Sequence, residues 1–335
     1  MKKINIGFID FWPTFNPEDN IFTNCLRKYY DVTISDNPDY LFCSCFGRKH
    51  FKYKDCIKIF YTGENIIPDF NLYDYSMGFH YIDFGDRYLR LPHYVLYPEN
   101  IDKALNKHTH EDAYYLNKKK FCNYVISNPY AAGERQAMID LLNEYKTVDS
   151  GGRYNNNVGG PVPDKVAFSE NYRFTMAFEN SKMSGYATEK IFDAFAAETI
   201  PIYWGSPRIN EEFNREAFIN VMDYGSLQEA RDEVVRIYED DELYLRMMKA
   251  PIITENSQAA QCLRENYLDD YMRHIFDEDI DKAMRKNMVY AGRIYQKKLE
   301  GICKAEDVLD KVKAPMHKWN KQKYKLKKKL GLVKD

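Results

Sequence analysis

The sequence predicts an α/β fold that is divided into two domains. Short, nearly continuous apolar runs alternate with helical or turn segments in the first third of the chain, which is typical of parallel strands buried on both faces. A polar stretch over 99–120 interrupts this pattern and is the best candidate for a linker, and a second α/β unit follows it. The 335 residues are enough for two domains of ordinary size.

The first domain is expected to contain strands over 3–9, 32–35, 40–46 and 56–62 and a helix over 22–30. The second is expected to begin with a strand over 121–127 and a helix over 133–145, followed by a Gly- and Asn-rich loop over 149–163. An α/β unit then runs from 173 to 221, and helical segments continue from 227. We therefore predict domains over 1–117 and 118–290 and a helical, Lys-rich tail over 291–335.

The sequence contains no GxGxxG segment of the kind that binds dinucleotides. Two α/β domains in tandem without that segment suggest two facing, Rossmann-like domains with ligands in the cleft between them. Ligands of parallel sheets bind beyond the carboxyl ends of the strands, so functional residues are expected where the predicted strands stop.

Composition and charge argue against several classes of protein. The formal net charge is −2, so no global field favours nucleic acid. The seven cysteines are odd in number and include no CxxC pair, which argues against a disulfide scaffold and favours a reducing cytoplasm. No apolar run approaches the roughly 18 residues of a membrane span. No signal peptide is expected either, because the short apolar strand after Lys3 is interrupted by Asp10.

A phosphate site is expected around the strand over 174–178. This strand ends in Glu179-Asn180-Ser181, and Thr188 is a good cap for a helix that Glu189 and Lys190 would open. Free N–H groups and the positive end of the helix dipole favour phosphate at that position. Lys190 is unfavourable in a first turn unless an anion such as a diphosphate lies nearby. The alternative is an exposed lysine with a solvated ammonium.

The same segment resembles the signature of the α1,3-fucosyltransferases. The residues that carry the resemblance are FTMAFENS at 174–181, GYATEK at 185–190 and IPIYWG at 200–205, and they span more than thirty residues with the family's spacing. Glu198 stands where the commonest family pattern has glycine, which suggests a local loop variation. The resemblance, to the bacterial type of α1,3/4-fucosyltransferase, implies a GT-B-like fold with C-terminal helices.

The resemblance also implies roles for residues of the second domain, which would bind GDP-fucose. Lys190 would neutralise the leaving GDP, and Tyr186 would contact the donor phosphates. Glu189 and Asn180 would hold hydroxyls of the fucose or the ribose. Arg153 lies in a loop, 150–153, that resembles the family's donor loop, and would be a second cation on the diphosphate. Without the resemblance, Arg153 would be interpreted as a solvated loop residue.

The strand over 57–62 ends in Gly63-Glu64-Asn65, which places a carboxylate where it could face the cleft. A glutamate at such a position is more often a surface or turn residue. The family carries Thr-Gly-Glu-Asn at this position and a segment like 83–92 after it, and both are present. The resemblance therefore implies that Glu64 is the general base. One carboxylate is enough for a single displacement with inversion, whereas a retaining sugar hydrolase needs two.

The acceptor that the resemblance implies is a glycan bound by the first domain. Its reactive group would be the 3-hydroxyl of N-acetylglucosamine in a galactosyl disaccharide, which gives a Lewis-type product on a surface glycan. A glucose acceptor and transfer to a 4-hydroxyl remain open. Two rival functions also remain: another nucleotide-sugar glycosyltransferase on the same scaffold, and a non-catalytic protein that binds glycans or nucleotides.

No metal site is predicted. The chain has no DxD segment next to an apolar strand, and the resemblance implies a metal-independent enzyme whose only cofactor-like partner is the donor substrate GDP-fucose. His108 and His110 lie near Glu111 and Asp112, but in the predicted linker, where solvated side chains are expected. For Cys43 and Cys45, which share one strand face, buried packing is the expected role.

From Pro315 the tail can form a basic amphipathic helix, with Trp319, Leu326, Leu330 and Val333 near one face. This pattern suits peripheral binding to an anionic membrane surface. A disordered, soluble tail is the alternative, and nucleic-acid binding by the tail is disfavoured by the charge balance of the remaining chain. The expected location is the cytoplasm, with the inner membrane face as the site of any peripheral contact.

Overall fold

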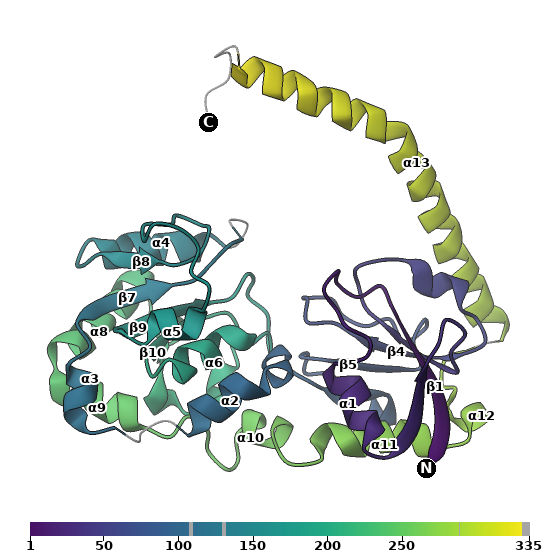
Figure 1. Ribbon diagram of the computed structural model, residues 1–335, viewed down its shortest axis with the longest axis horizontal. Helices are drawn as coiled ribbons and strands as arrows, with labels where there is room; N and C mark the ends of the chain where they lie inside the picture. The colour runs from purple at the N-terminus through teal and green to yellow at the C-terminus, as the bar shows by residue number, and fades with distance from the viewer. Residues whose placement is uncertain (107–109, 129–131, 288, 330–335) are drawn as a thin grey trace.

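The computed structural model of the chain contains two parallel β-sheets, each with helices packed against it (Figure 1). It describes residues 1–106, 110–128, 132–287 and 289–329, with side chains described as far as 309 and at 311. The prediction of two successive α/β units is confirmed.

The first sheet has the strand order β2-β1-β3-β4-β5-β6, and each neighbouring pair is parallel. The strands are β1 (Lys2–Ile9), β2 (Tyr30–Ile34), β3 (Tyr40–Cys43), β4 (Ile57–Tyr61), β5 (Tyr75–Gly78) and β6 (Tyr88–Arg90). The last two are too short to give a periodic pattern and are not predicted from the sequence. Helix α1 (Ile21–Arg27) ends earlier than predicted because Tyr30 already belongs to β2. Two 3₁₀ turns, η1 (Lys49–Lys52) and η2 (Gly85–Arg87), lie in the loops.

The second sheet has the order β11-β10-β9-β7-β8 and is also parallel throughout. Its strands are β7 (Lys120–Tyr124), β8 (Val148–Ser150), β9 (Tyr172–Phe178), β10 (Ile200–Trp204) and β11 (Ile219–Asn220). The helices and turns around it are α4 (Gly133–Asn143), α5 (Lys165–Ser169), α6 (Glu189–Ala196), α7 (Ile209–Glu212), η4 (Arg215–Ala217), η5 (Val221–Asp223), α8 (Leu227–Glu239) and α9 (Asp241–Lys249).

The stretch over 99–120, which the sequence predicts to be a linker, is largely helical among the residues that the structure describes. It contains α2 (Pro98–Leu105) and α3 (Asp112–Leu116), and α2 follows the turn η3 (His93–Leu96). Ile101 and Ala104 of α2 are buried in the same cluster as Phe192 of α6. The helical periodicity of α2 is hard to see in the sequence because few of its residues are apolar.

Lys118, at the end of this stretch, is buried and donates to the carbonyls of Ala197 and Glu198 after α6. Burial lowers the pKa of its ammonium to about 8. Glu198 adopts a left-handed φ of 51°, which is why glycine suits this position in the family pattern. Nε2 of His110 lies 3.7 Å from the Glu198 carboxylate, so His110 is not simply solvated. His108 lies outside the described residues.

The chain returns to the first sheet after α10 (Gln258–Cys262). Leu268, Met272 and Phe276 of α11 (Tyr267–Asp277) fill the core of the first sheet, where the ring of Phe276 stacks on Tyr40 at 4.2 Å. The short helix α12 (Ile280–Ala283) follows, and Figure 1 shows α11 and α12 at the end of the first sheet near β1. The range 118–290, predicted as one domain, therefore contributes to both cores.

One buried carboxylate joins the two units. Glu212, at the end of α7, is fully buried and accepts hydrogen bonds from Arg90 at 2.6 Å and from Tyr94 at 2.9 Å. The Tyr81 hydroxyl donates to it at 3.3 Å. Three side chains from the first 94 residues thus hold a carboxylate of the second sheet's unit, which constrains how the two sheets face each other.

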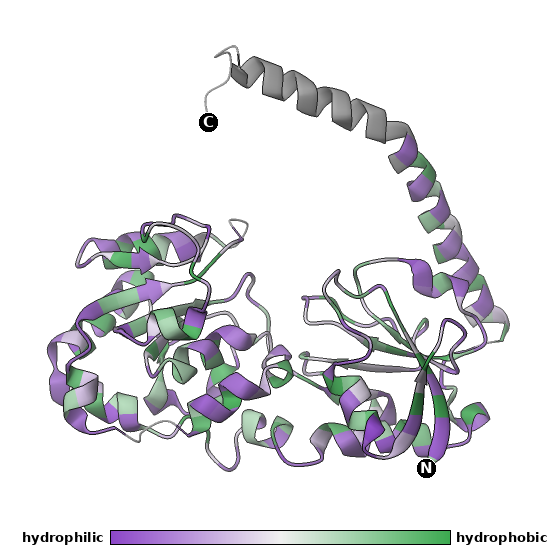
Figure 2. Cartoon of the chain, viewed as in Figure 1, coloured by the Kyte–Doolittle hydropathy of each residue, from purple (hydrophilic) through white to green (hydrophobic). Residues whose placement is uncertain are grey.

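Helix α13 (Tyr290–Lys329) extends away from the first unit, and its coloured part alternates between hydrophilic and hydrophobic residues (Figure 2). Its first turns are attached by polar contacts: the Tyr295 hydroxyl donates to Asp69 at 2.6 Å, and Arg48 pairs with Glu306 at 2.7 Å. Ile302, Val308 and Leu309 remain more than half exposed. No helix among the described residues is long and apolar enough to span a membrane.

The segment after α12 is attached to the first sheet through Asp74. This buried carboxylate accepts the backbone N–H groups of Lys58, Arg285 and Lys286 and pairs with the buried Lys286 ammonium at 2.8 Å. We predict that Asp74→Ala lowers the free energy of unfolding by about 3–5 kcal/mol, because a buried ammonium loses its counter-charge.

Urea denaturation followed by circular dichroism measures this change. Asp279→Ala is the matched control, because it removes an aspartate from an exposed pair with Lys282 on the same segment and should have little effect. Equal unfolding midpoints for the two variants would contradict the role of Asp74.

Candidate active site

A cavity of about 440 Å³ lies where strands of both sheets end. Its first-unit residues follow β1, β3, β4 and β6, and its second-unit residues follow β9 or begin α6. This is the position expected for ligands of parallel sheets. The lining residues are Trp12, Thr14, Phe46, Gly63, Glu64, His93, Tyr97, Asn180, Tyr186, Thr188, Glu189 and Lys190. Five of the six residues predicted from the sequence are among them, and Arg153 is not.

Helix α6 begins at Glu189, as predicted, but Thr188 does not cap it with its side chain. The Thr188 hydroxyl instead lies 2.8 and 2.9 Å from the two carboxylate oxygens of Glu179, and its N–H donates to Glu179 at 2.7 Å. The first-turn N–H groups of α6 therefore have no side-chain acceptor and face the cavity end of the helix. Such groups, with the helix dipole, favour an anion.

Lys190 already has an anionic partner. Its ammonium donates to Glu179 Oε2 and to the Thr188 hydroxyl, each at 2.8 Å. Burial opposes the charge, but the carboxylates of Glu179 and Glu189 raise the pKa of Lys190. The anion that a cation in this first turn needs nearby is therefore present in the protein itself, because Glu179 supplies it. An ammonium has three N–H donors, so one remains for a ligand.

Glu189 lies on the same helix turn and meets a histidine from the segment that follows β6. Its Oε2 is 3.2 Å from Nδ1 of His93, and its Oε1 is 3.9 Å from the Lys165 ammonium. Burial opposes ionisation, but the contact with His93 and the charge of Lys190 lower the pKa of Glu189. Glu189 is therefore an ionised acceptor at neutral pH.

Tyr186 and Asn180 complete the second-unit wall. Tyr186 is 4% exposed, and burial, followed by the charge of Glu179, raises the pKa of its hydroxyl to about 12. The hydroxyl thus stays protonated and can donate. Asn180 Oδ1 accepts a hydrogen bond from the buried Arg135 at 2.8 Å, which leaves the amide N–H groups of Asn180 for the cavity.

Glu64 is exposed on the opposite wall, in the loop that follows β4. Its N–H donates to the Thr62 hydroxyl at 3.0 Å, and the next residue, Asn65, donates to Ser181 of the second unit at 3.3 Å. The backbone at Gly63 lies close to His93: a Cβ at residue 63 would be only 2.2 Å from the imidazole Cδ2. The loop that carries Glu64 is therefore held against both units.

Arg153 is exposed in the loop after β8 and forms no ion pair with any residue that the structure describes. The backbone of Gly152 next to it packs on Ile126, where a Cβ would lie 1.8 Å from the carbonyl oxygen. The structure does not bring Arg153 to the other predicted residues.

Sequence reasoning missed three residues that hold the site together: Glu179, Arg135 and His93. Glu179 is fully buried directly after the buried strand β9. A buried carboxylate requires a cation or hydrogen-bond donors beside it, so its position in the sequence could have indicated such partners. Arg135 donates to the carbonyls of Phe178 and Glu179 as well as to Asn180. Neither Arg135 nor His93 stands in a pattern that marks it in the sequence.

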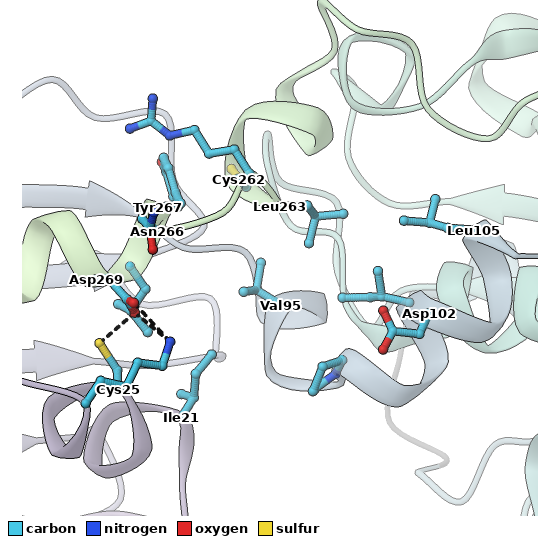
Figure 3. A pocket seen from close by; sticks show the side chains of 15 residues that line it. Ile21, Cys25, Val95, Asp102, Leu105, Cys262, Leu263, Asn266, Tyr267 and Asp269 are labelled. Carbon is cyan, nitrogen blue, oxygen red and sulfur yellow. Dashed lines mark hydrogen bonds and ion pairs between the residues drawn. The ribbon is translucent and has the colours of Figure 1, made fainter.

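A second cavity, of about 340 Å³, opens between α1, α2 and the segment from α10 to α11 (Figure 3). Its polar centre is Asp269, which accepts from the Cys25 thiol at 3.0 Å and from Lys28 at 2.9 Å. Burial, with the neighbouring Asp269, raises the pKa of Cys25 and so disfavours the nucleophilic thiolate. Within the described ranges, no group of three His, Cys, Asp or Glu side chains is placed to hold a metal ion.

The fold and the cavity place the chain in the class of GT-B-type glycosyltransferase folds. A crystal structure of an α1,3-fucosyltransferase superposes with a TM-score of 0.75 and 28% identity, over 86% of this chain and 93% of that one. A structure of an α1,3-fucosyltransferase with GDP-fucose gives a TM-score of 0.71 and 29% identity, over 83% and 92% of the two chains.

The sequence comparisons agree. The family model for the N-terminal domain of the α-(1,3)-fucosyltransferase FucT matches residues 6–97, and the model for the C-terminal part of glycosyltransferase family 10 (fucosyltransferase) matches 115–251. The chain belongs to this α1,3-fucosyltransferase family, as the motif resemblance predicts.

Individual relatives match only part of their own length. The α-(1,3)-fucosyltransferase FucT of Helicobacter pylori is 35% identical over 271 residues, which are 70% of this chain and 56% of that protein. The 4-galactosyl-N-acetylglucosaminide 3-α-L-fucosyltransferase 9 of Bos taurus is 31% identical over 133 residues, 38% of this chain and 36% of that protein. The chain thus spans little more than half of the first relative and about a third of the second.

The contact between Glu179 and Lys190 yields a prediction about proton binding. In Glu179→Gln the ammonium of Lys190 stays largely buried but loses the carboxylate that raises its pKa, so the pKa of Lys190 should fall. NMR titration of ¹³C-methylated lysines measures it, with Lys190→Arg identifying the resonance. Glu211→Gln, which removes an exposed carboxylate on α7, should leave that titration unchanged. An unshifted Lys190 in Glu179→Gln would contradict the contact.

Proposed function

We propose that this chain transfers L-fucose from GDP-fucose to the 3-hydroxyl of N-acetylglucosamine in a galactosyl-N-acetylglucosamine glycan, which gives a Lewis-type product. The observation that supports this proposal best is that Glu64 and Lys190 lie on opposite walls of one cavity. A glycosyl transfer with inversion needs a base on the acceptor side and stabilisation of the leaving diphosphate on the other side. The family relationship supports the choice of donor.

The donor would lie against the second unit, with its diphosphate at the start of α6. The uncapped N–H groups, the remaining N–H of Lys190 and the protonated Tyr186 hydroxyl can all donate to phosphate oxygens. Ionised Glu189 and the amide of Asn180 suit hydroxyl groups of the fucose or the ribose. These donors would act most strongly as the diphosphate gains charge on leaving.

We propose a role for Arg153 because the positive charge around the start of α6 is not sufficient to balance a diphosphate. Glu179 and Glu189 carry two negative charges beside Lys190 and the more distant Lys165. A diphosphate needs additional positive charge there. Arg153, on its exposed loop, is our candidate for that second cation once its side chain reaches the donor.

Glu64 would take the proton of the acceptor hydroxyl as that oxygen attacks the anomeric carbon. The bond to GDP breaks on the opposite face, so the configuration inverts in a single displacement and no second carboxylate is needed. We propose no metal in this scheme, because fixed N–H donors and cations take its place at the diphosphate. Turnover that is unchanged by EDTA is expected.

The function is tested by incubating GDP-fucose with isomeric galactosyl-N-acetylglucosamine acceptors and determining the product linkage by NMR. Transfer to the 3-hydroxyl supports the proposal, and transfer only from GDP-mannose or a UDP-sugar favours a different donor. Nucleotide binding without transfer of any sugar would instead indicate the non-catalytic alternative.

We predict that Glu64→Gln abolishes fucosyl transfer while GDP binding, measured by calorimetry, stays within about twofold of the unaltered chain. Glutamine keeps the shape of the side chain but cannot accept the hydroxyl proton at neutral pH. Glu255→Gln is the control, because Glu255 is an exposed glutamate in a loop outside the cavity. Near-normal turnover by Glu64→Gln would exclude Glu64 as the base.

A peripheral membrane contact through the tail is a separate part of the proposal. The tail beyond Pro315 lies outside the described side chains, so its amphipathic pattern rests on the sequence. Exposed Ile302, Val308 and Leu309 on the preceding turns of α13 support it. Truncation before Pro315 should reduce sedimentation with anionic vesicles, and increasingly so at low salt. Equal sedimentation of the full-length and truncated chains would contradict the proposed membrane contact.

A further inference from the structure

The first-unit wall of the cavity carries two aromatic side chains whose surface is not covered. Trp12, which follows β1, and Phe46, which follows β3, both line the cavity that contains Glu64. Phe46 is 50% exposed and Trp12 is half-buried. Their rings meet edge to face, with centroids 6.2 Å apart. Exposed ring surface inside a concave site is surface that a partly apolar ligand can cover.

The backbone holds the two rings together through Asp10. Asp10 adopts a left-handed φ of 62°, which turns the chain at the end of β1, and its carbonyl accepts the N–H of Phe46 at 2.9 Å. Its carboxylate accepts the N–H groups of Lys49 and His50 at 3.0 and 2.9 Å and lies 2.8 Å from His50 Nδ1. The loop that carries Phe46 is therefore anchored to the loop that carries Trp12.

Trp12 is supported on the side of its own loop by other aromatic rings. Phe11 and Phe15 lie 5.5 and 5.2 Å from it, and they stack on each other at 4.1 Å. A ring braced in this way loses little conformational entropy when a ligand binds, which favours affinity. Trp12 and Phe46 thus form a rigid aromatic wall.

The position and shape of this wall indicate which ligand it suits. The groups proposed to hold the nucleotide lie on the second unit, whereas the wall lies on the first, with Glu64. Rings set edge to face cannot sandwich a flat base, but they offer one face and one edge to a pyranose. In galactose the axial 4-hydroxyl leaves the hydrogens of C3, C4 and C5 on one face, which gives a continuous apolar surface for an aromatic ring.

We propose that Trp12 and Phe46 form the binding subsite for the galactosyl residue of the acceptor. This inference rests on the proposed function. With galactose against Trp12, the adjoining N-acetylglucosamine extends toward Glu64, which is on the same wall. The subsite thereby selects a disaccharide acceptor over N-acetylglucosamine alone.

Kinetics with two acceptors test the subsite. Trp12→Ala should raise the KM for the galactosyl-N-acetylglucosamine acceptor about tenfold, with a much smaller effect on the KM for GDP-fucose. With N-acetylglucosamine as the acceptor, the same substitution should have little effect, because the sugar that contacts the ring is missing. If the substitution affects the disaccharide acceptor but not the monosaccharide, the effect depends on the galactose, which indicates a direct contact between Trp12 and that sugar. Trp12→Phe should restore most of the affinity.

Phe46→Ala should act in the same direction, and Phe84→Ala is its matched control. Phe84 is a 45% exposed phenylalanine of the same unit that does not line the cavity, so its removal should leave the acceptor KM unchanged. If Trp12→Ala weakens both acceptors equally, or neither, the galactose subsite is wrong.

Saturation-transfer NMR separates this inference from the proposed reaction, because it measures binding without turnover. With GDP present, transfer of magnetisation to galactose H3, H4 and H5 is expected in the unaltered chain and should be lost in Trp12→Ala. Equal transfer in both chains, or none in the unaltered chain, would overturn the subsite. Failure of the proposed function would instead appear as binding of the acceptor without fucosyl transfer to it.

Discussion

The arrangement of the site depends on the burial of the Glu179 carboxylate. An ionised carboxylate without water must be satisfied by several donors at once, and here the Thr188 N–H and hydroxyl and the Lys190 ammonium supply them. This requirement determines where α6 begins and which way Thr188 turns. It also explains Gly205 after β10, since a Cβ there would lie 2.5 Å from Glu179 Cγ.

The same contact changes how the positive charge of the site should be understood. Lys190 is held by Glu179 before any ligand arrives, which lowers the conformational entropy that its side chain loses on binding. Its charge, however, is largely balanced by neighbouring carboxylates. At the start of α6 itself, attraction of an anion therefore depends on oriented N–H groups more than on net charge, and that attraction should be less sensitive to salt than the attraction of a lysine cluster would be.

Much of the fold could be predicted from the sequence, because parallel strands such as β4, β9 and β10 are buried along their whole length and consist mainly of apolar residues. Short strands such as β5 and β6 carry too few residues for a pattern, and α2 hides its small apolar face in a polar stretch. The return of α11 to the first sheet could not be foreseen either, since an amphipathic helix shows which face is buried but not against which sheet.

The residues of the candidate site also divide into those that could be predicted from the sequence and those that could not. Glu64, Asn180, Tyr186, Glu189 and Lys190 could be found because they stand in the motifs that carry the family resemblance, and the structure brings them to one cavity. Arg153 stands in a loop whose path no periodicity determines. His93 and Arg135 act through contacts with residues distant in the chain, and no local pattern encodes such contacts.

The return of the chain to the first sheet has a consequence for synthesis on the ribosome. The core of the first sheet includes Met272, Ile275 and Phe276, and Asp74 is paired only when Lys286 is in place. The six strands of that sheet emerge within the first 90 residues, yet the part of their apolar face that α11 covers stays exposed until nearly 200 more have been made. The buried residues packed around the second sheet extend to Ala259 of α10, so this core can be completed before that of the first sheet. During that interval the growing chain exposes an aggregation-prone surface, and a chaperone that shields it would aid its folding.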